Sequence, residues 1–314
     1  MSSKKGSAVL VSVFIPAHNE AGNITPLLDK IARTFADHNL DGEVVLVDDG
    51  STDGTAAEAA AGAARYPWLR VFTHRRRLGL TAAMKTGFRQ VRGDVVVFLP
   101  ADLESDPEED IPKLLDKLAE GYDVVAGWRQ GRREGKVVAS TIYNFVSRRL
   151  FHVQAHDMNW VKAFRREVID DLPLRSDWHR FILMIAADKG YKIAEVPTSY
   201  YPRQTGRSKY GFWRLPVSFL DVLVVKFLLT FSQKPMLFFG AIGSLFALAG
   251  LGTGLWLVYL WLTTQTQQRP ILLLAFVLIL AGLLLFLVGF LAELVVSQGE
   301  RIEAIEQRLR ERGE

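Results

Sequence analysis

Two long stretches without a charged residue lie in the last third of the chain, and they limit its possible folds more than any other feature. The first covers residues 235–268 and the second covers residues 270–292. Each is longer than the ~20 apolar residues with which an α-helix crosses a bilayer. The link between them, TTQTQQRP, is too short to hold a domain. The two stretches therefore predict a hairpin of two transmembrane helices, with both ends on the same side of the membrane.

The charges around this hairpin predict its orientation. The link carries only Arg269, whereas basic residues flank the other end of the hairpin: Arg214, Lys226, Lys234, Arg301, Arg308, Arg310 and Arg312. Loops that stay in the cytoplasm are enriched in Lys and Arg. We therefore expect both termini in the cytoplasm, in a multi-pass protein of the inner (plasma) membrane.

The part of the chain before the hairpin alternates between short apolar runs and helical stretches. The expected strands are 9–15, 43–47, 69–73, 95–99 and 123–126, and the expected helices are 21–38, 52–66, 81–91 and 111–120. This order is typical of an α/β domain, in which helices cover both faces of a mostly parallel sheet. We expect the cytoplasmic domain at 1–210, an interfacial amphipathic helix at 211–234, the two transmembrane helices at 235–297 and a cytoplasmic amphipathic tail at 298–314.

Composition excludes several classes of protein. The apolar run before PAHNE is short and has no small-residue cleavage site, so it is interpreted as a first strand and not as a signal peptide. The chain has no cysteine, which excludes disulfides and thiol chemistry. The net charge is only +4, and no basic stripe is interleaved with aromatic residues, so we expect no nucleic-acid partner.

Three polar turns follow predicted strands: PAHNE at 16–20, DDGSTDGT at 48–55 and PADLE at 100–104. In open parallel sheets, ligands bind outside the carboxyl ends of the strands. One such turn alone would be explained by helix capping, with Gly50 in a left-handed conformation and Ser51 or Thr52 as the cap. Three acid-bearing turns at one edge instead indicate a ligand site. The chain lacks the glycine motifs of dinucleotide-binding and P-loop proteins.

The turn after the apolar run 95–99 carries two carboxylates, Asp102 and Glu104, separated by one residue. Such hard oxygen ligands suit Mg²⁺ or Mn²⁺ that is shared with substrate phosphates. The acids that follow are interpreted differently, because acids and first-turn prolines (Pro107, Pro112) favour a helix start. These capping acids are Asp106, Glu108, Glu109 and Asp110. Asp102 and Glu104 lie too early for that role.

Taken in order, the motifs carry a resemblance to a known family. They are PAHNE, VDDGSTDGT, RRLGLTAAMKTGF, PADLESDPEEDIP, FRREV, EVP and RQTGRSKYG. Over about residues 8–235 the chain resembles family 2 glycosyltransferases of the GT-A fold. It is most similar to the branch of dolichyl-phosphate mannose synthase and the bacterial polyprenyl-phosphate glycosyltransferases. Together the motifs are specific, although each alone is weak.

The resemblance implies roles for residues at matching positions. The nucleotide-sugar pocket would be formed by Pro16, His18, Asn19, Glu20, Asp48, Asp49 and Asp102. Within it, Asp48 and Asp49 would face the base and the ribose, and Asp102 with Glu104 would face the metal and the diphosphate. The sequence departs from the family at Pro100, which replaces the first acid of an acid-x-acid triplet. It also departs at Glu104 and Arg77, where glutamine and asparagine are common.

Two basic loops follow the predicted sheet. Attraction to anionic lipid explains part of their charge. The residues that we expect to bind a lipid phosphate are Arg129, Arg132, Arg203, Ser208 and Lys209. Asp102 and Arg129 are the expected catalytic residues. Acceptor-facing residues are expected at Asp157, Trp178, His179 and Arg180, although a structural role for His179 is an equal alternative.

These features predict an inverting transfer of a sugar from a nucleotide sugar to a polyprenyl phosphate at the cytoplasmic membrane face. A phosphate monoester is largely dianionic at neutral pH, so it needs no protein base to attack the anomeric carbon. The expected partners are the nucleotide sugar, the polyprenyl phosphate, the membrane and, as a homo-oligomer, further copies of the chain. A membrane-tethered nucleotide-sugar binder without activity and a polysaccharide synthase are the alternatives. The synthase would need a Q-x-x-R-W element and usually more spans.

The charge asymmetry predicts how single cysteines will react in this cysteine-free chain. A cysteine at Thr264 should react with an impermeant maleimide in sealed cells, whereas one at Gly313 should react only after lysis. Labelling of both sites from outside would contradict the hairpin.

Overall fold

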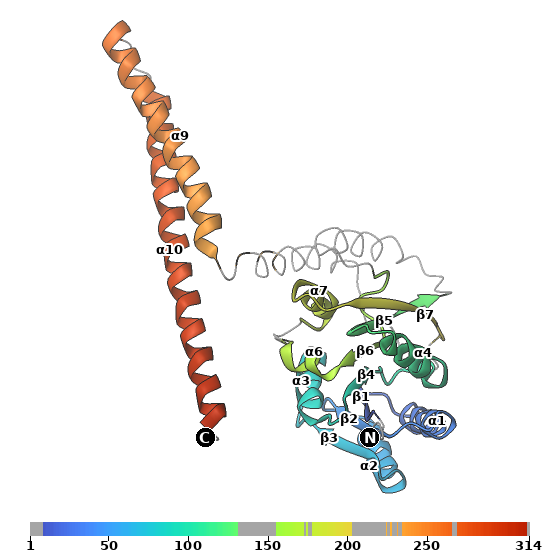
Figure 1. Ribbon diagram of the computed structural model, residues 1–314. Coiled ribbons are helices and arrows are strands. Elements are labelled where there is room, and N and C mark those ends of the chain that lie inside the picture. Colours follow the sequence, from blue (N-terminus) through green and yellow to red (C-terminus); the bar gives the residue numbers. More distant parts are fainter. Residues whose placement is uncertain are drawn as a thin grey trace, which may run out of the picture. The chain divides into compact units, whose positions relative to one another are not determined.

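The computed structural model describes residues 9–130, 155–172, 174, 178–202, 224, 227, 231, 234–265 and 269–312. They form two compact units, Met1–Val222 and Leu223–Glu314. The first unit contains a sheet covered by helices, and the second contains two long helices (Figure 1). The predicted domain boundary at residue 210 falls outside the described residues and stays a prediction.

The sheet of the first unit is mostly parallel, as predicted. Its strands are β1 (Val11–Ala17), β2 (Gly42–Asp48), β3 (Leu69–Thr73), β4 (Val95–Phe98), β5 (Val124–Gln130), β6 (Lys162–Arg165) and β7 (Ile193–Ser199). They lie in the order β3-β2-β1-β4-β6-β5-β7. Only β6 runs antiparallel to its neighbours, β4 and β5. The carboxyl ends of the other strands therefore lie at one edge of the sheet, together with the amino end of β6.

Helices cover both faces of this sheet (Figure 1). Their bounds are α1 (Ile24–Asp37), α2 (Thr55–Arg65), α3 (Leu80–Gln90), α4 (Pro107–Ala119), α6 (Arg166–Asp171), the 3₁₀ helix η1 (Trp178–Phe181) and α7 (Ile182–Asp188). One face buries aliphatic side chains of α1, α2 and α4 against alternate residues of the strands. On the other face, the rings of Phe88 and Phe98 pack against Phe14, with ring centroids 5.2 and 6.0 Å away. A Cβ at Gly87 would lie 2.2 Å from the Phe14 ring, so the close packing of α3 requires glycine there.

Two predicted element ends were wrong by four residues, the largest differences among the predicted elements. Helix α4 begins at Pro107 and not at residue 111, because the Asp106 carboxylate caps it by accepting a hydrogen bond from the Glu108 N–H at 3.0 Å. Pro112 consequently lies inside the helix and not in its first turn. Strand β5 continues to Gln130, so Arg129 lies within the sheet and not in a loop beyond it.

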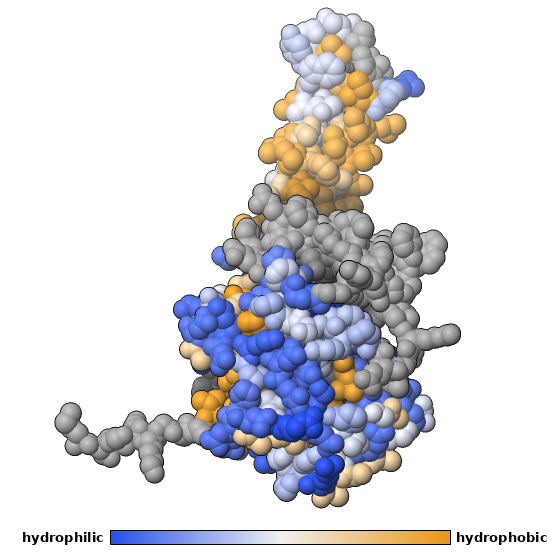
Figure 2. Space-filling model, turned by 90° about the vertical axis from the view of Figure 1, so that its right-hand side faces the viewer, coloured by the Kyte–Doolittle hydropathy of each residue, from blue (hydrophilic) through white to orange (hydrophobic). Residues whose placement is uncertain are grey.

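The second unit consists mainly of helix α9 (Pro235–Thr264) and helix α10 (Arg269–Arg312). Two segments, Pro235–Thr264 and Arg269–Gly299, are long and apolar enough to cross a membrane. Most of their large apolar side chains are exposed, including Leu245, Leu273 and Leu284. Figure 2 shows this apolar surface as an orange zone on the two helices. A core helix of a soluble protein would bury such side chains, so the exposure favours lipid as their surroundings. The predicted tail 298–314 is not a separate helix, because α10 continues to Arg312.

Small residues let α9 and α10 approach each other closely. A Cβ at Gly243 would lie 2.7 Å from the carbonyl oxygen of Gly282, and one at Gly250 would lie 2.8 Å from that of Ala275. Helices in lipid associate through such close backbone contacts, since lipid is as apolar as their side chains. Glu293 of α10 adds a polar contact, because its carboxylate accepts a hydrogen bond from the Met236 N–H at 3.1 Å. This bond satisfies one backbone donor at the start of α9.

The predicted interfacial segment 211–234 lies largely outside the described residues. Its described rings, Phe227 and Phe231, pack against Phe238 of α9, with centroid distances of 5.1 and 4.6 Å. The end of this segment is therefore in contact with the first turn of α9.

The hairpin packing predicts a specific cross-link in the cysteine-free chain. A Cβ at Gly289 would lie 3.0 Å from the Phe239 Cβ, so Phe239→Cys with Gly289→Cys should oxidise to an intramolecular disulfide. Adding Gly243→Leu should abolish most of it by separating the helices, as measured by maleimide mass-tagging. Gly252→Leu is the matched control, because no atom lies within 4 Å of its Cβ position. An unchanged cross-link in the Gly243→Leu background would refute the packing.

Candidate active site

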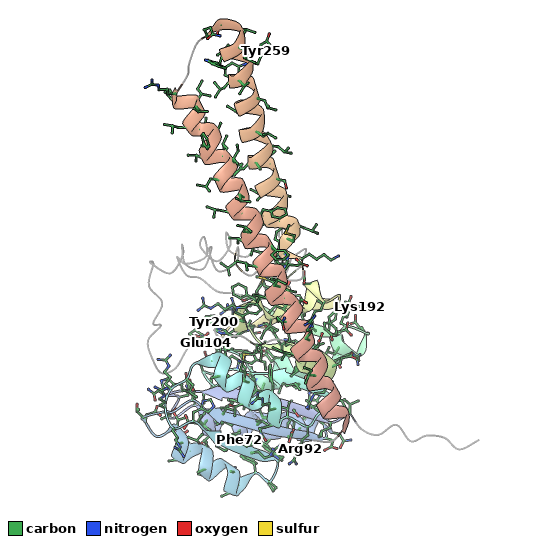
Figure 3. The ribbon with its side chains drawn as sticks, turned by 90° about the vertical axis from the view of Figure 1, so that its left-hand side faces the viewer. Phe72, Arg92, Glu104, Lys192, Tyr200 and Tyr259 are labelled. Carbon is green, nitrogen blue, oxygen red and sulfur yellow. The ribbon has the colours of Figure 1, made fainter. Side chains whose placement is uncertain are left out.

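The three polar turns lie side by side at the carboxyl edge of the sheet. Ala17 of β1 pairs with Asp48 of β2, and Phe14 of β1 pairs with Phe98 of β4. The turns after β1, β2 and β4 therefore begin on neighbouring strands, as the sequence predicted. Glu104 lies at this end of the first unit and Arg92 at the opposite end (Figure 3).

The first two turns hold each other in place. The Asn19 N–H donates to Ser51 Oγ at 2.9 Å, and the Asn19 side-chain oxygen accepts from the Thr52 N–H at 2.9 Å. His18 Nδ1 lies 2.9 Å from the Asp49 carbonyl oxygen, and the Glu20 N–H donates to Thr55 Oγ1 at 2.8 Å. Asn19 adopts a left-handed backbone conformation with φ of 57°. These bonds fix the predicted nucleotide-pocket residues from Pro16 to Glu20 on the turn after β2.

Asp48 is nearly completely buried, with 1% of its surface exposed. One carboxylate oxygen, Oδ1, accepts hydrogen bonds from the Ser51 N–H at 3.1 Å and from the Ser51 hydroxyl. The other oxygen, Oδ2, is buried and has no hydrogen-bond partner among the described residues. Such an orphaned acceptor is costly in a folded protein and commonly marks a place where a ligand binds.

The carboxylate of Asp49 is hydrogen-bonded to other groups of the protein. Its carboxylate accepts hydrogen bonds from the backbone N–H groups of Leu78 and Gly79, at 2.8 and 2.7 Å, and lies 2.8 Å from His74 Nδ1. Burial alone would raise the pKa of Asp49, but the hydrogen bonds from His74, Leu78 and Gly79 outweigh it and lower the pKa. Asp49 thus anchors the loop 74–79. Its predicted contact with the ribose stays a prediction.

The anchored loop brings three consecutive arginines, Arg75, Arg76 and Arg77, to the surface beside the turn after β2. A Cβ at Gly50, whose φ is 64°, would lie 2.3 Å from the Arg76 carbonyl carbon. Glycine is therefore required at position 50 both for its conformation and for the close approach of the loop.

The predicted metal turn follows β4. Asp102 is 8% exposed, and its Oδ1 accepts a hydrogen bond from the Glu104 N–H at 3.3 Å. Leu103 between them has a left-handed φ of 55°, which is strained for a leucine and is typical of functional turns. The Glu104 carbonyl oxygen accepts from the Tyr201 N–H at 2.9 Å, so this turn is tied to the segment that follows β7.

The donor set at this turn fits a divalent cation that is shared with a substrate. Within the part of the chain that the structure describes, no three His, Cys, Asp or Glu side chains gather as a metal site. Mg²⁺ is usually bound through one or two carboxylates together with substrate phosphates, and not by a cage of protein ligands. The carboxylates of Asp102 and Glu104 are of the type that fits such a cation, and their role as its ligands stays a prediction.

Arg129 is paired with Asp157, a residue predicted to face the acceptor. Its Nε and Nη2 donate to the two Asp157 carboxylate oxygens at 2.5 and 3.2 Å. The guanidinium also lies over the Trp160 ring, 4.5 Å from its centroid. A bidentate pair stacked on an aromatic ring holds an arginine in a defined orientation. Arg129 and Asp102 lie at the same edge of the sheet, on β5 and after β4, with β6 between these strands.

The remaining predicted residues are those expected to face the acceptor and those expected to bind the lipid phosphate. Of the first group, His179 in η1 lies with its Nδ1 3.0 Å from the Thr81 hydroxyl of α3, and this contact joins the two helices. Arg132, Arg203, Ser208 and Lys209, predicted to bind the lipid phosphate, lie outside the described residues.

Sequence reasoning missed three polar side chains at this edge: His74, Lys162 and Glu195. Glu195 of β7 accepts hydrogen bonds from the His156 N–H at 2.7 Å and the Asp157 N–H at 3.2 Å. His74 follows β3, so the rule of strand ends could have indicated it. Lys162 begins β6 and Glu195 lies inside β7, and no local pattern distinguishes either of them.

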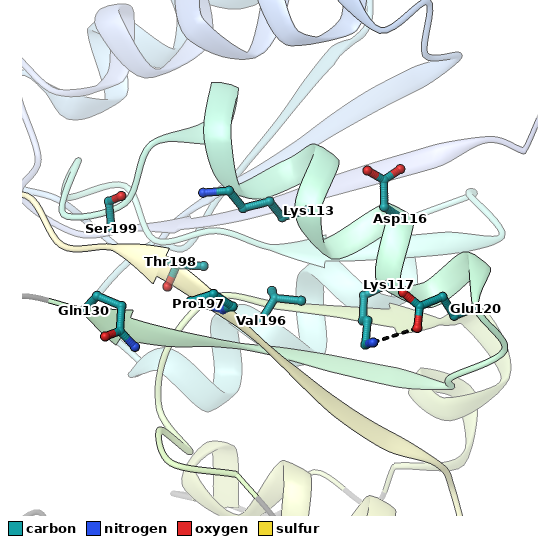
Figure 4. Close-up of a pocket in the computed structure, with 9 residues that line it drawn as sticks. All are labelled: Lys113, Asp116, Lys117, Glu120, Gln130, Val196, Pro197, Thr198 and Ser199. Carbon is teal, nitrogen blue, oxygen red and sulfur yellow. Dashed lines mark hydrogen bonds and ion pairs between the residues drawn. The ribbon is translucent and has the colours of Figure 1, made fainter.

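A groove of about 590 Å³ lies elsewhere on the first unit, between α4 and the strands β5 and β7. Its lining residues are Lys113, Asp116, Lys117, Glu120, Gln130, Val196, Pro197, Thr198 and Ser199 (Figure 4). Lys117 pairs with Glu120 at 2.6 Å, so its charge is compensated. None of the predicted site residues lines this groove. The location of the chemistry at the acid-bearing turns stays a prediction.

The first unit has the GT-A fold. The structure is similar to glucosyl-3-phosphoglycerate synthase from Mycobacterium tuberculosis in complex with Mn²⁺ and UDP-glucose. The TM-score is 0.57 at 23% identity, over 69% of this chain and 79% of that one. This likeness concerns the fold alone.

Sequence comparison then identifies the family. Residues 12–182 match the model of glycosyl transferase family 2. The chain is 31% identical to the dodecaprenyl-phosphate galacturonate synthase of Rhizobium johnstonii, over 94% of this chain and 90% of that protein. It is 33% identical to the undecaprenyl-phosphate 4-deoxy-4-formamido-L-arabinose transferase of Pseudomonas fluorescens, over 77% and 70%. The chain belongs to glycosyl transferase family 2, which confirms the resemblance, and its two apolar helices make it a membrane protein of that family.

The Asp49 network predicts a local effect of Asp49→Asn. An amide cannot accept from all three donors, so the loop 74–79 should open and stability should fall by about 1–3 kcal/mol. Because the pKa of Asp49 is lowered, its contribution should be complete above the usual carboxyl range and be lost as the pH falls through that pKa. Hydrogen exchange at the Leu78 and Gly79 amides and chemical unfolding measure the two effects. The exposed Asp41→Asn is the control, and equal exchange in both variants would contradict the anchoring role.

Proposed function

We propose that this protein transfers a sugar from a nucleotide sugar to a polyprenyl phosphate, with inversion at the anomeric carbon. The observation that carries the proposal is the extent of the similarity to the galacturonate synthase. That alignment covers 94% of the chain and so extends beyond the family model, which ends at residue 182, into the apolar helices. The likeness therefore includes both the transferase domain and the part that suits a lipid substrate.

The donor would bind at the turns after β1 and β2. Asp48 Oδ2 is a buried acceptor without a partner, and a nucleobase N–H would supply the missing hydrogen bond. Pro16, His18, Asn19 and Glu20 would form the neighbouring wall, on a backbone held by the bonds to Ser51 and Thr55. Asp49 would support the pocket by holding the loop 74–79.

The donor diphosphate would lie at the turn after β4. Asp102 and Glu104 would hold Mg²⁺ or Mn²⁺ there, with the diphosphate oxygens as further ligands. When bound, the metal would neutralise charge on the departing nucleoside diphosphate. Pro100, in place of an acid, leaves these two side chains as the carboxylates of the turn.

The acceptor would be a phosphate monoester that acts as its own nucleophile, so the site needs to position anions and not to remove a proton. Arg129 would orient that phosphate, while Asp157 holds its Nε edge. Further contacts would come from Arg132, Arg203, Ser208 and Lys209. Tyr201, two residues before Arg203 in the sequence, donates its N–H to the Glu104 carbonyl oxygen.

The charge asymmetry around the hairpin supports placing the reaction at the cytoplasmic face of the inner (plasma) membrane, with the chain crossing twice. We also propose a homo-oligomer. Pro100 favours one alternative, a nucleotide-sugar binder without activity, because it removes an acid from the usual triplet.

Turnover separates these two functions. Purified protein, undecaprenyl phosphate and a panel of radiolabelled nucleotide sugars with Mg²⁺ or Mn²⁺ should give an acid-labile product that is extracted into organic solvent. Asp102→Asn should reduce the rate by about a hundredfold, because an amide is a poorer ligand for a hard cation. Glu104→Gln should reduce the rate less than Asp102→Asn does, because glutamine keeps a carbonyl oxygen that can bind the metal. The exposed Asp37→Asn serves as the control. Near-normal turnover by Asp102→Asn at saturating donor and metal would remove the metal assignment.

A further inference from the structure

Lys162 is a buried cation at the same edge of the sheet, and the reaction described above does not use it. It is the first residue of β6 and pairs with Phe98 of β4 and Ala126 of β5. Because β6 runs opposite to both strands, its first residue lies at the carboxyl end of β4 and beside the middle of β5. Only 4% of Lys162 is exposed, although lysine is almost never buried without a reason.

The surroundings of the ammonium group are largely apolar. Lys162 Nζ donates to the Trp160 carbonyl oxygen at 2.7 Å and lies 5.7 Å from the centroid of the Phe98 ring. Among the described residues it has no carboxylate within ion-pair distance. Burying a charge without a paired counter-ion lowers the stability of the folded state, so the buried Lys162 suggests a function for its charge.

The charged groups that influence Lys162 are Arg129 and Asp157. Burial lowers the pKa of Lys162 to about 8, the attraction of Asp157 opposes this effect, and the repulsion of Arg129 adds to it. Arg129 is paired with Asp157 through two hydrogen bonds. Trp160 links the two cations, because its carbonyl accepts from Lys162 and its ring stacks on Arg129. Of these two cations, Lys162 is the one without an ion pair to a described carboxylate.

The arrangement leaves one edge of Arg129 for an anion. Asp157 takes the Nε and Nη2 donors, and no hydrogen bond joins Nη1 to another described residue. A positive charge in a poorly polarisable interior acts over a longer distance than one in water. Lys162 can therefore assist an anion that it does not touch.

We propose that Lys162 is a positioning residue for the acceptor phosphate. Its buried positive charge attracts a phosphate dianion bound at the Nη1 edge of Arg129, while Asp157 holds the other edge of that guanidinium. The inference rests on the proposed function, because it takes a lipid phosphate as the second substrate.

The test compares three variants of the full chain in detergent. Lys162→Met keeps the approximate shape and removes the charge, Lys162→Arg keeps the charge, and Lys192→Met changes an exposed lysine outside the site. Binding of undecaprenyl phosphate and of the neutral lipid undecaprenol is titrated by tryptophan fluorescence. Lys162→Met should weaken binding of the phosphate about tenfold and leave undecaprenol unchanged. Lys162→Arg should restore most of the affinity, and Lys192→Met should match the wild type.

Stability distinguishes this role from a purely structural one. Removing a buried, unpaired charge should leave Lys162→Met at least as stable as the wild type in chemical unfolding. A structural lysine would instead lower stability and phosphate affinity together, and that result would overturn the proposal.

The pH dependence gives an independent readout. Lysine is charged below its pKa, so the wild type should lose phosphate affinity as the pH rises through about 8. Lys162→Arg should keep its affinity to about pH 10, because arginine stays protonated there. The same decline in both proteins would overturn the proposal.

The failure of the inference is distinguishable from that of the proposed function. If the wild type binds undecaprenyl phosphate no better than undecaprenol, the proposed acceptor is wrong, and the proposed role of Lys162 is then refuted as well. If the wild type prefers the phosphate and Lys162→Met does so equally, the acceptor stands and the role of Lys162 is refuted.

Discussion

The parallel pairing of β1 with β2 and β4 is the constraint on which the candidate site depends. It brings the turns after three strands to one edge, although they are separated by tens of residues in the chain. Side-chain bonds then fix the turn after β1 to the turn after β2, through Asn19 with Ser51 and Thr52. Asp49 ties the turn after β2 to the loop after β3. The hydrophobic faces of the sheet position the backbone, and the polar groups at its edge are left to bind ligands.

Both acids and cations lie at this edge. Asp48 at the end of β2 keeps a buried oxygen without a partner among the described residues, and Asp102 and Glu104 form the proposed metal turn after β4. Arg129 of β5 is paired with Asp157, Lys162 begins β6, and three arginines of the loop 74–79 lie beside the turn after β2. Transfer between a nucleotide sugar and a phosphate requires two anions to approach each other. A metal at the proposed turn, together with these cations, is suited to that task.

The sequence predicted the layers of the fold well, because strands of Val and Ile alternate with helices and turn residues mark their ends. It also predicted the edge of the site, since PAHNE, DDGST and PADLE end strands that share a direction. The antiparallel insertion of β6, and with it Lys162, could not be predicted, because strand order depends on long-range pairing and not on local pattern. The engagement of Asp49 by His74, Leu78 and Gly79 was missed for the same reason. Asp106 as the cap of α4 was predicted correctly, while the start of that helix was placed four residues too late.

The central claim is that the oxygen of a lipid phosphate attacks the anomeric carbon of a nucleotide sugar bound at this edge. Phosphorus NMR of the lipid product and chromatography of the released nucleotide test it most directly. The account predicts a single phosphodiester signal in the lipid product, together with one equivalent of nucleoside diphosphate. A pyrophosphate pair in the lipid product, with nucleoside monophosphate released, would show attack at phosphorus and would contradict it.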